Sequence, residues 1–323
     1  MEILLAAQFF FYIGGDIVNI VVVGSLNMDA VISLDRYPTS GETVTASSIQ
    51  YIPGGKGANQ AVAAARLGAA VTHIGMVGND DHGRTLVQAL KQDRIDTAYV
   101  QMWEGPTGMA FVHVEHAGAN RIILAPGANA LFSPEVLQPL KNVISRADAV
   151  LVQLEIPMET VQLTLQYART ANVPVYLDPA PARLDLFDYI HEVDWITPNE
   201  SEAKMLTGEP VHSAEGAQRA ATRLQQMGAK GVIIKAGENG AYVFDEHGLI
   251  HQPGFSVEAV DTTAAGDAFN AGFVIEFLRS RDVHRAMRFG CAVGALTTTK
   301  PGAQTSIPNQ TDVTAFLSRH DVV

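Results

Sequence analysis

A regular alternation of short apolar runs and helical segments, between residues 149 and 206, constrains the fold more than any other feature of the sequence. Apolar runs occupy residues 149–154, 175–177 and 195–196, and helical patterns occupy residues 158–171 and 199–206. An earlier run at residues 19–24 is continuous and β-branched, which is typical of a strand buried on both faces of a parallel sheet. Strands that alternate with helices favour a right-handed parallel arrangement. We therefore expect an α/β fold whose mostly parallel sheet is covered by helices.

Two irregular β segments fall outside this alternation. Residues 31–45 alternate weakly between apolar and polar side chains and contain Pro38 and Gly41. Residues 108–124 contain two β runs separated by a turn. We expect these segments to form a small sheet apart from the main one.

The first 18 residues precede the first expected strand. Their apolar stretch at residues 3–13 is too short to span a bilayer. A secretory signal needs a basic start, whereas the first charged residue here is Glu2. We expect an N-terminal extension at residues 1–18, either a misassigned start or a poorly ordered segment, then a single domain at residues 19–318 and a tail at residues 319–323.

Charge and cysteine content restrict the partners and the compartment. The net charge is -12 over 323 residues, and no basic run offsets it, which argues against a general nucleic-acid partner or an anionic membrane surface. The single cysteine, Cys291, lies in an apolar run and is interpreted as a buried small side chain. Because one cysteine cannot form an internal disulfide, we expect a reducing, cytoplasmic location.

A glycine-rich turn, PGGKGANQ at residues 53–60, runs directly into an alanine-rich helix. It is not a Walker loop, and Gln60 stands where the dinucleotide-binding fingerprint needs its third glycine. The turn brings backbone, Lys56 and Asn59 close to a ligand, or it merely starts a helix. Asn27 and Asp29, which follow the strand at residues 19–24, either bind a polar ligand beyond its end or form a turn.

A second turn, at residues 259–272, also opens a helix. Two threonines and small residues lead to Gly266 and Asp267, and an amphipathic pattern follows. The free amides of such a helix start, with the positive end of the helix dipole, favour an anion. Asp267 is either a general base or an ordinary acid of the first helical turn.

Two further segments leave alternatives open. Asn199 and Glu202 are three residues apart at a helix start, where they either form a capping box or hold a hydrated Mg²⁺ or phosphate. The turn at residues 235–241 either approaches a nucleotide or closes a hairpin.

The two glycine-containing turns are similar to the signatures of one known family. GGKGANQA at residues 54–61 and DTTAAGDAF at residues 261–269 resemble those of the ribokinase-like carbohydrate kinases. Further segments agree in the same order: GSLNMD at 24–29, QLE at 153–155, DPAPAR at 178–183, TPNESE at 197–202 and GAQ at 302–304. The resemblance covers roughly residues 19–318. It implies a ribokinase-like fold with helices on both faces of the sheet and a small β lid at residues 31–45 and 108–124, which also serves as the interface of a homodimer.

The resemblance also implies roles for individual residues. Asp267 is similar to the catalytic base, and the amides of Ala264, Ala265, Gly266 and Asp267 to the anion hole for the transferred phosphoryl group. The positions similar to the family's sugar-binding residues are Asn27, Asp29, Gly55, Lys56, Asn59, Glu155 and Asp267. Those similar to its ATP-binding residues are Asn199, Lys235, Gly237, Glu238, Gly240 and Gly266.

Two ions are implied in the same way. Asn199 and Glu202 match a motif near Mg²⁺, which they would hold indirectly. The positions that resemble a monovalent-cation site, for K⁺ as activator, are Asp261, Thr263, Thr297, Lys300, Gly302 and Ser306. Three departures from the family pattern stand out: Lys235 replaces a frequent Thr, Lys300-Pro301 replaces Arg-Lys, and Cys291 lies near the expected adenine edge.

The expected function is therefore ATP-dependent phosphorylation of D-ribose at its 5-hydroxyl. GGKGANQA and DPAPAR are most similar to family members that act on ribose. The alternatives are a kinase for deoxyribose, another sugar or a nucleoside, and a sugar-binding regulator without catalysis. A nicotinamide-dependent oxidoreductase is disfavoured because the glycine-rich turn breaks the dinucleotide fingerprint.

Overall fold

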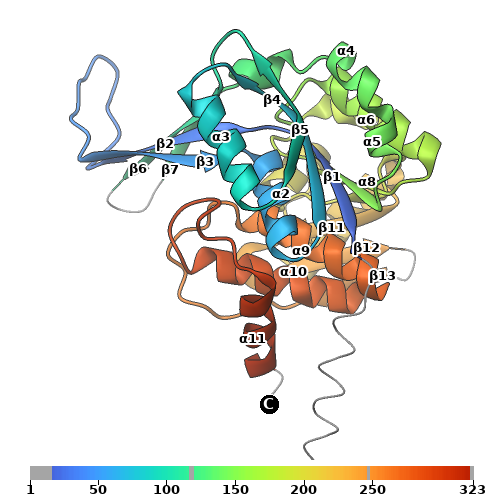
Figure 1. Cartoon of the computed structure of the whole chain (residues 1–323). Helices are drawn as coiled ribbons and strands as arrows, with labels where there is room; N and C mark the ends of the chain where they lie inside the picture. Colours follow the sequence, from blue (N-terminus) through green and yellow to red (C-terminus); the bar gives the residue numbers. More distant parts are fainter. Residues whose placement is uncertain (1–16, 116–119, 246–247, 321–323) are drawn as a thin grey trace, which may run out of the picture.

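The computed structural model describes residues 17–115, 120–245 and 248–320, and its centre is a nine-stranded sheet (Figure 1). The strands are β1 (Asn19–Val23), β4 (Ala70–Gly78), β5 (Asp96–Trp103), β8 (Ala149–Gln153), β9 (Val175–Asp178), β10 (Trp195–Ile196), β11 (Gly231–Lys235), β12 (Ala241–Asp245) and β13 (Gly248–Gln252). Their order is β13-β12-β11-β10-β9-β8-β1-β4-β5. All neighbours pair in parallel except β11–β12 and β12–β13 at one edge. The expected mostly parallel α/β sheet is confirmed.

Helices cover both faces of this sheet. The α-helices are α2 (Lys56–Arg66), α3 (Asp81–Gln92), α4 (Pro134–Leu137), α5 (Lys141–Ile144), α6 (Met158–Ala171), α7 (Glu200–Thr207), α8 (Ala214–Gln226), α9 (Ala265–Ser280), α10 (Val283–Thr298) and α11 (Gln310–His320). Short 3₁₀ turns are η1 (Gly127–Leu131), η2 (Gln138–Leu140), η3 (Leu184–Asp188), η4 (Ile190–Glu192) and η5 (Gly237–Asn239). Helices α9, α10 and α11 gather in the lower part of Figure 1, and α4, α5 and α6 at its upper right.

The alternation of side chains along β1 explains the two layers. Ile20 and Val22 pack into a core with α2, α3, α9 and α10, whereas Val21 and Val23 pack into a second core with α4, α6, α7 and α8. Successive side chains of a strand point to opposite faces, so a continuous apolar run can fill two cores at once. Val18 is also buried in the first core, one residue before β1.

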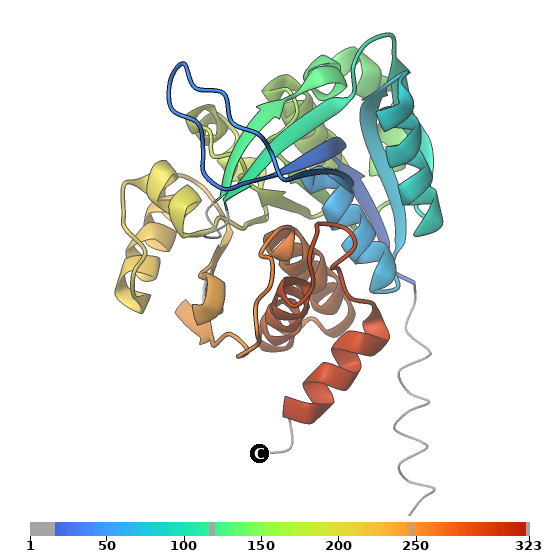
Figure 2. The ribbon, with the colours of Figure 1, turned by 90° about the vertical axis from the view of Figure 1, so that its left-hand side faces the viewer.

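A second sheet of four strands projects from the main body. It contains β2 (Asn27–Leu34), β3 (Ser48–Gly54), β6 (Gly108–Glu115) and β7 (Asn120–Ala125) in the order β3-β2-β6-β7. The loop between β2 and β3 stands away from the molecule in Figure 2. The segment expected at residues 31–45 is therefore the end of β2 and this loop, because Pro38 and Gly41 lie in the connection. Residues 116–119, within the second expected segment, lie outside the described residues.

Strands β3 and β5 were not expected from the sequence. Most residues of both strands are half-buried or exposed, so neither shows the continuous apolar run of a central strand. β5 is the edge of the main sheet beside β4, and β3 is an edge of the small sheet. The carboxyl-terminal helix α11 continues to His320, and residues 1–16 and 321–323 lie outside the described part of the chain. In the residues that are described, no helix combines the length and apolar character needed to cross a bilayer.

Candidate active site

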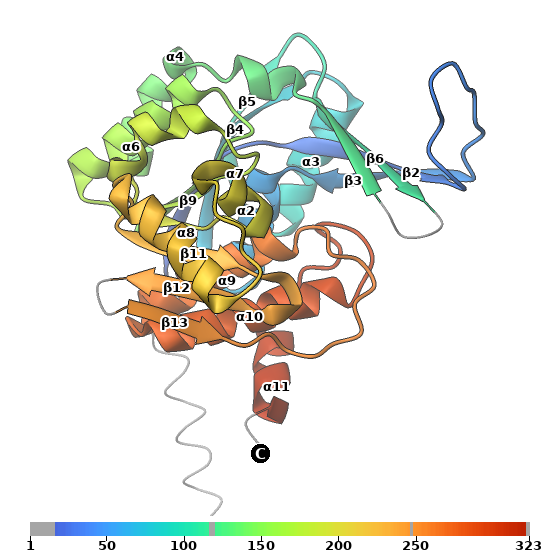
Figure 3. The same cartoon turned by 180° about the vertical axis from the view of Figure 1, so that it is seen from behind.

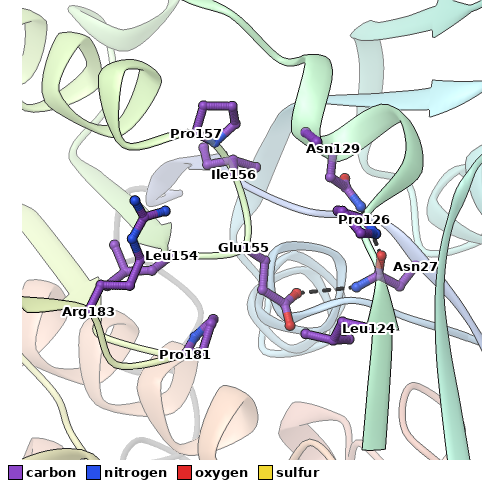
Figure 4. A pocket seen from close by; sticks show the side chains of 11 residues that line it. Asn27, Leu124, Pro126, Asn129, Leu154, Glu155, Ile156, Pro157, Pro181 and Arg183 are labelled. Carbon is purple, nitrogen blue, oxygen red and sulfur yellow. Dashed lines mark hydrogen bonds between the residues drawn. The ribbon is translucent and has the colours of Figure 1, made fainter. Parts of the chain in front are cut away.

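Most of the residues expected to bind sugar or nucleotide line two pockets beyond the carboxyl ends of the central strands. Figure 3 shows α2 and α7 near the centre of the molecule when it is seen from behind. A pocket of about 1210 Å³ is lined by Lys56, Lys235 and Asp267, among others. A second one, of about 300 Å³, is lined by Asn27 and Glu155 (Figure 4). Ligands of open α/β sheets bind at this edge.

Helix α2 begins at Gly55, whose φ is 90°. A Cβ atom there would lie 2.6 Å from the amide nitrogen of Asn27, so the turn requires glycine. The start of the helix is occupied by a carboxylate: Glu155 Oε2 accepts hydrogen bonds from the Lys56 amide at 3.2 Å and the Ser25 hydroxyl at 2.5 Å. A half-buried acid therefore lies at the positive end of the helix, where it is stabilised.

Asn27 and Asp29 lie on β2, so the turn, which was one of the two alternatives for them, is not formed. The Asn27 amide donates to Glu155 Oε2 at 3.3 Å, and its own oxygen accepts from Asn129 Nδ2 at 2.8 Å (Figure 4). Asn129 thus fixes which way the Asn27 amide points. The result is a row of polar groups that can donate to and accept from sugar hydroxyls.

Asp29 is buried against Gly54, with an exposed fraction of 8%. Burial, with Glu155 and Asp267 nearby, raises the pKa of Asp29 to about 7. Lys56 is half-buried, and its removal from solvent alone would lower its pKa. The four surrounding carboxylates, Asp267, Asp178, Glu155 and Glu202, instead raise the pKa of Lys56 well above its usual value.

Helix α9 begins at Ala264, whose φ is 61°. The Ala265 amide donates back to the Thr262 carbonyl at 3.3 Å. Among the described residues, nothing accepts a hydrogen bond from the amides of Gly266 and Asp267, and both residues line the larger pocket. This helix start is open to an anion from outside the protein.

The Asp267 carboxylate lies at this helix start and is almost fully buried. Asn59 Nδ2 donates to its Oδ2 at 3.0 Å, and Gln60 Nε2 donates to its Oδ1 at 3.1 Å. Burial raises the pKa of Asp267 to about 6, against the opposing effect of Lys56. A carboxylate with a pKa near 6 is mostly ionised at neutral pH and is a stronger base than an exposed one.

Asp178 and Lys235 form an ion pair beside the start of α9. Their Oδ1 and Nζ atoms are 3.0 Å apart, and their side chains are 3% and 12% exposed. A Cβ atom at Gly266 would lie 3.4 Å from Lys235 Nζ, so the ammonium group stands beside the open helix start. Lys235, where the family often has Thr, therefore adds positive charge at that point.

Asn199 and Glu202 form the capping box of α7. The Glu202 amide donates to Asn199 Oδ1 and the Asn199 amide to Glu202 Oε2, both at 2.8 Å. Both side chains also line the larger pocket, so capping and ligand contact are compatible. Burial and Asp178 raise the pKa of Glu202.

The turn after β11 contributes Gly237, Glu238 and Gly240 to the wall of the same pocket. The turn also closes the β11–β12 hairpin, so the hairpin interpretation is confirmed, and the approach to a nucleotide stays a prediction. Cys291 lines the pocket as well, and burial raises the pKa of its thiol to about 12, which keeps it protonated.

Asp261 joins the two segments expected to hold a monovalent cation. Its Oδ1 accepts from the Thr263 amide at 2.9 Å and its Oδ2 from the Gly302 amide at 2.9 Å. The hydroxyl groups of Thr297 and Ser306 donate to carbonyls within their own segments, and Lys300 is exposed. The described residues hold no group of three or more His, Cys, Asp or Glu side chains arranged for a metal ion.

Sequence reasoning missed five polar residues of the site. They are Ser25, Gln60, Asn129, Gln153 and Asp178, all of which are buried. Four carried a usable signal, because each lies in a segment that resembles the family: GSLNMD contains Ser25, GGKGANQA contains Gln60, QLE opens with Gln153 and DPAPAR opens with Asp178. Asn129 had none, since it comes from a short 3₁₀ turn far from either motif.

Comparisons with known proteins identify the family of this chain. The model of the family described as pfkB family carbohydrate kinase matches residues 18–310. The chain is 42% identical to a ribokinase from Haemophilus influenzae over 93% of this chain and 98% of that protein, and 34% identical to a deoxyribokinase from Salmonella typhi over 94% and 100%. It is also similar to the structure of Arabidopsis thaliana ribokinase complexed with ribose and ATP, with a TM-score of 0.86, 32% identity and coverage of 93% and 99%.

Proposed function

The chain belongs to the pfkB family of carbohydrate kinases, and from this membership we propose that it phosphorylates D-ribose at the 5-hydroxyl with ATP. The observation that carries the proposal is Asp267, a buried carboxylate at the open start of α9, between the polar cluster around Glu155 and the larger pocket. Ribokinase relatives and the ribose and ATP of the Arabidopsis complex support the choice of sugar.

The proposed reaction uses Asp267 as general base. As the sugar oxygen attacks the γ-phosphorus, the hydroxyl proton passes to the carboxylate, the new O–P bond forms, and the bond to the bridging oxygen breaks to release ADP. The amides of Ala264, Ala265, Gly266 and Asp267 stabilise the negative charge of the transferred group. The proposed sugar contacts are Asn27, Asp29, Gly55, Lys56, Asn59 and Glu155.

The larger pocket is proposed to bind ATP. Its size, its glycine turn and the charge of Lys235 support nucleotide phosphates there. We assign Asn199, Lys235, Gly237, Glu238, Gly240 and Gly266 to ATP. Glu202 and Asn199 are suited to Mg²⁺ held through water, because this ion keeps several waters and takes few carboxylates. Bound Mg²⁺ neutralises phosphate charge.

K⁺ activation is a further part of the proposal. The segments around Asp261 and Gly302 are tied together by a hydrogen bond, which supports a cation site built from their carbonyl groups. The proposed set is Asp261, Thr263, Thr297, Lys300, Gly302 and Ser306.

The small sheet is proposed to be a lid and the interface of a homodimer. Leu124 of β7 lines the smaller pocket, and Tyr51, Ile122 and Ile123 are large apolar side chains exposed on the sheet. An exposed apolar surface of this kind favours association. We place the enzyme in the cytoplasm, where ATP is available.

A sugar panel tests the function. The purified protein is assayed with Mg-ATP and with ribose, deoxyribose, fructose, glucose or adenosine, in K⁺ and in Na⁺ buffers. We expect the highest kcat/KM for ribose and a higher rate in K⁺. Ribose turnover no better than that of glucose or fructose would overturn the assignment, and a preference for deoxyribose would establish the second candidate, which the Salmonella relative favours.

A further inference from the structure

Gln60 lies between two carboxylates of the site. It is on α2 and 1% exposed. Its Nε2 atom donates to Asp267 Oδ1 at 3.1 Å and to Asp178 Oδ2 at 3.1 Å. One neutral amide group therefore donates one N–H to Asp267, at the proposed sugar site, and the other to Asp178, beside the proposed nucleotide site.

The orientation of this amide is determined by its neighbours. If the Gln60 amide were flipped, its oxygen would face both carboxylates, which accept and cannot donate. With Nε2 toward the carboxylates, Oε1 points at Gln153, whose Nε2 donates to it at 2.6 Å. Gln153 ends β8 and Asp178 ends β9, and the two residues are register partners in neighbouring strands. The strand ends thus fix Gln60 from one side.

The network ends in hydrogen-bond donors on both sides, one charged and one neutral. Lys235 Nζ holds the other oxygen of Asp178 at 3.0 Å, and Asn59 holds the other oxygen of Asp267 at 3.0 Å. Both oxygens of each carboxylate are therefore restrained. Two negative charges so close to one another repel, and the two N–H donors that Gln60 places between them offset this repulsion.

We propose that Gln60 is a positioning residue: it holds the Asp267 carboxylate in the orientation that receives the sugar proton and ties it to the Asp178–Lys235 pair beside the phosphate site. The inference rests on the proposed function for the identity of the base. It does not make Gln60 a group that touches the substrate. A hydrogen bond from Gln60 also lowers the pKa of Asp267 against burial and Asp178.

Two variants test the proposal. In Gln60→Met the side chain keeps its approximate volume and loses both donors, and in Gln60→Glu it becomes an acid between two others. For Gln60→Met we expect kcat to fall by roughly 10- to 100-fold, with KM for ribose nearly unchanged, because misplaced reacting groups cost rates of this order. The acidic limb of the kcat profile should move up by about one pH unit, since the base loses a donor.

Gln60→Glu provides the readout that a structural role would not move. Near pH 8 the new carboxylate repels Asp267 and Asp178, so the activity of Gln60→Glu should be below that of Gln60→Met. As the pH falls, the new acid takes a proton and can donate an O–H to one neighbour, so the activity ratio of Gln60→Glu to Gln60→Met should rise. The charged groups facing Asp267 are Lys56 from α2, Asp178 from β9 and Asp29 from β2. Since both variants of position 60 share these groups, their effects cancel in this ratio. A ratio that is constant with pH would overturn the proposal.

A measurement without turnover separates this inference from the proposed function. Because the folded-state pKa of Asp267 exceeds its unfolded value, its ionisation costs stability as pH rises through about 6. In Gln60→Met the pKa of Asp267 should be higher, so the loss of stability continues to a higher pH. The gap in Tm between wild type and Gln60→Met should therefore widen between pH 6 and 8. A constant gap refutes the role of Gln60 whatever the sugar, whereas a widening gap in a protein that phosphorylates no sugar refutes the function alone.

Discussion

Helices α2 and α9 both begin at a residue with a positive φ, 90° at Gly55 and 61° at Ala264. Neither residue type can cap a helix with its side chain. Other helices of the chain begin differently: α3, α7, α8 and α10 start at Asp80, Asn199, Ser213 and Asp282, whose side chains accept hydrogen bonds from the first turn. The two exceptional starts are the two that carry the glycine-containing motifs.

The two starts differ in what satisfies them. At α2 the first amide already donates to Glu155, and Ser25 accepts hydrogen bonds from the next two. At α9 the amides of Gly266 and Asp267 find no acceptor in the described structure and face the pocket. A helix start without a side-chain cap can therefore have either of two uses. When an internal carboxylate binds its amides, it positions side chains of the protein; when none does, its amides remain free to bind a phosphoryl group.

The largest expected effect concerns the acid at α9. Asp267→Asn keeps the size of the side chain and removes the base, so kcat should fall by about 10²–10⁴-fold while ribose binding is largely retained. Steady-state kinetics and calorimetric titration with ribose measure the two quantities. An unchanged kcat would remove Asp267 from the chemistry and leave α9 as an ordinary helix start.

A matched pair of glycines compares the two starts directly. In Gly57→Ala on α2, the new Cβ would lie 2.7 Å from backbone atoms of Gly24 and Ser25, so we expect a loss of stability of about 1–3 kcal/mol. In Gly266→Ala on α9, the nearest atom is Lys235 Nζ at 3.4 Å, so the fold should accept the methyl group. The methyl group would stand in the anion site, and kcat/KM for ATP should fall by roughly 10- to 100-fold.

Thermal melts and ATP kinetics of both glycine variants test this difference between the two helix starts. If Gly266→Ala loses stability and Gly57→Ala loses only ATP turnover, the distinction between a filled and an open helix start is wrong.

The charge beside α9 gives a smaller effect in two separable parts. Lys235→Met leaves Asp178 buried without its cation, which should cost about 3–5 kcal/mol of stability. Adding Asp178→Asn should restore most of that stability, because the unpaired charge is gone. ATP binding should stay weakened in the double variant, since the positive charge beside Gly266 is still missing. Recovery of ATP affinity along with stability would make the pair purely structural. Chemical denaturation and nucleotide titration distinguish these outcomes.

The smallest effect is a pH dependence on the sugar side, near α2. The pKa of Asp29 is raised to about 7, above its unfolded value, so Asp29 favours folding at low pH and loses that contribution as pH rises toward 7. Asp29→Asn removes this cost, and Tm at pH 8 should rise by roughly 2–4 °C, the shift that about 1 kcal/mol produces in a chain of this class. The gain should vanish below pH 4, and KM for ribose should rise. A gain in Tm that is equal at pH 4 and pH 8 would contradict the raised pKa.

Much of the fold could be predicted because its signals are local. The helix at residues 158–171 has the expected bounds, and β1 and β8 followed from their continuous apolar runs. The edge strands β3 and β5 escaped because an exposed strand lacks such a run. The capping box of α7 could also be predicted, since it depends on the spacing of Asn199 and Glu202.

Part of the candidate site could be predicted from the sequence for the same reason. Lys56 and Asp267 stand in two motifs more than two hundred residues apart, and the structure brings them into one pocket. Their roles in sugar and phosphate binding stay predictions. Asn129 could not be identified, because its partner Asn27 is distant in the chain and no motif contains Asn129. Gln153 opens the QLE segment, but its contact with Gln60 is likewise distant in the chain and could not be predicted.

The sequence by itself determined the α/β class, the family and the position of the two helix starts, because periodicity, glycine spacing and a single acid are properties of short segments. The tertiary structure decided which start is filled and which is open. Glu155 reaches α2 from the end of β8, 99 residues from Lys56, and no local pattern encodes that contact. Likewise, the bridge from Asp267 through Gln60 to Asp178 exists because the ends of β8, β9 and β11 meet at one edge of a parallel sheet.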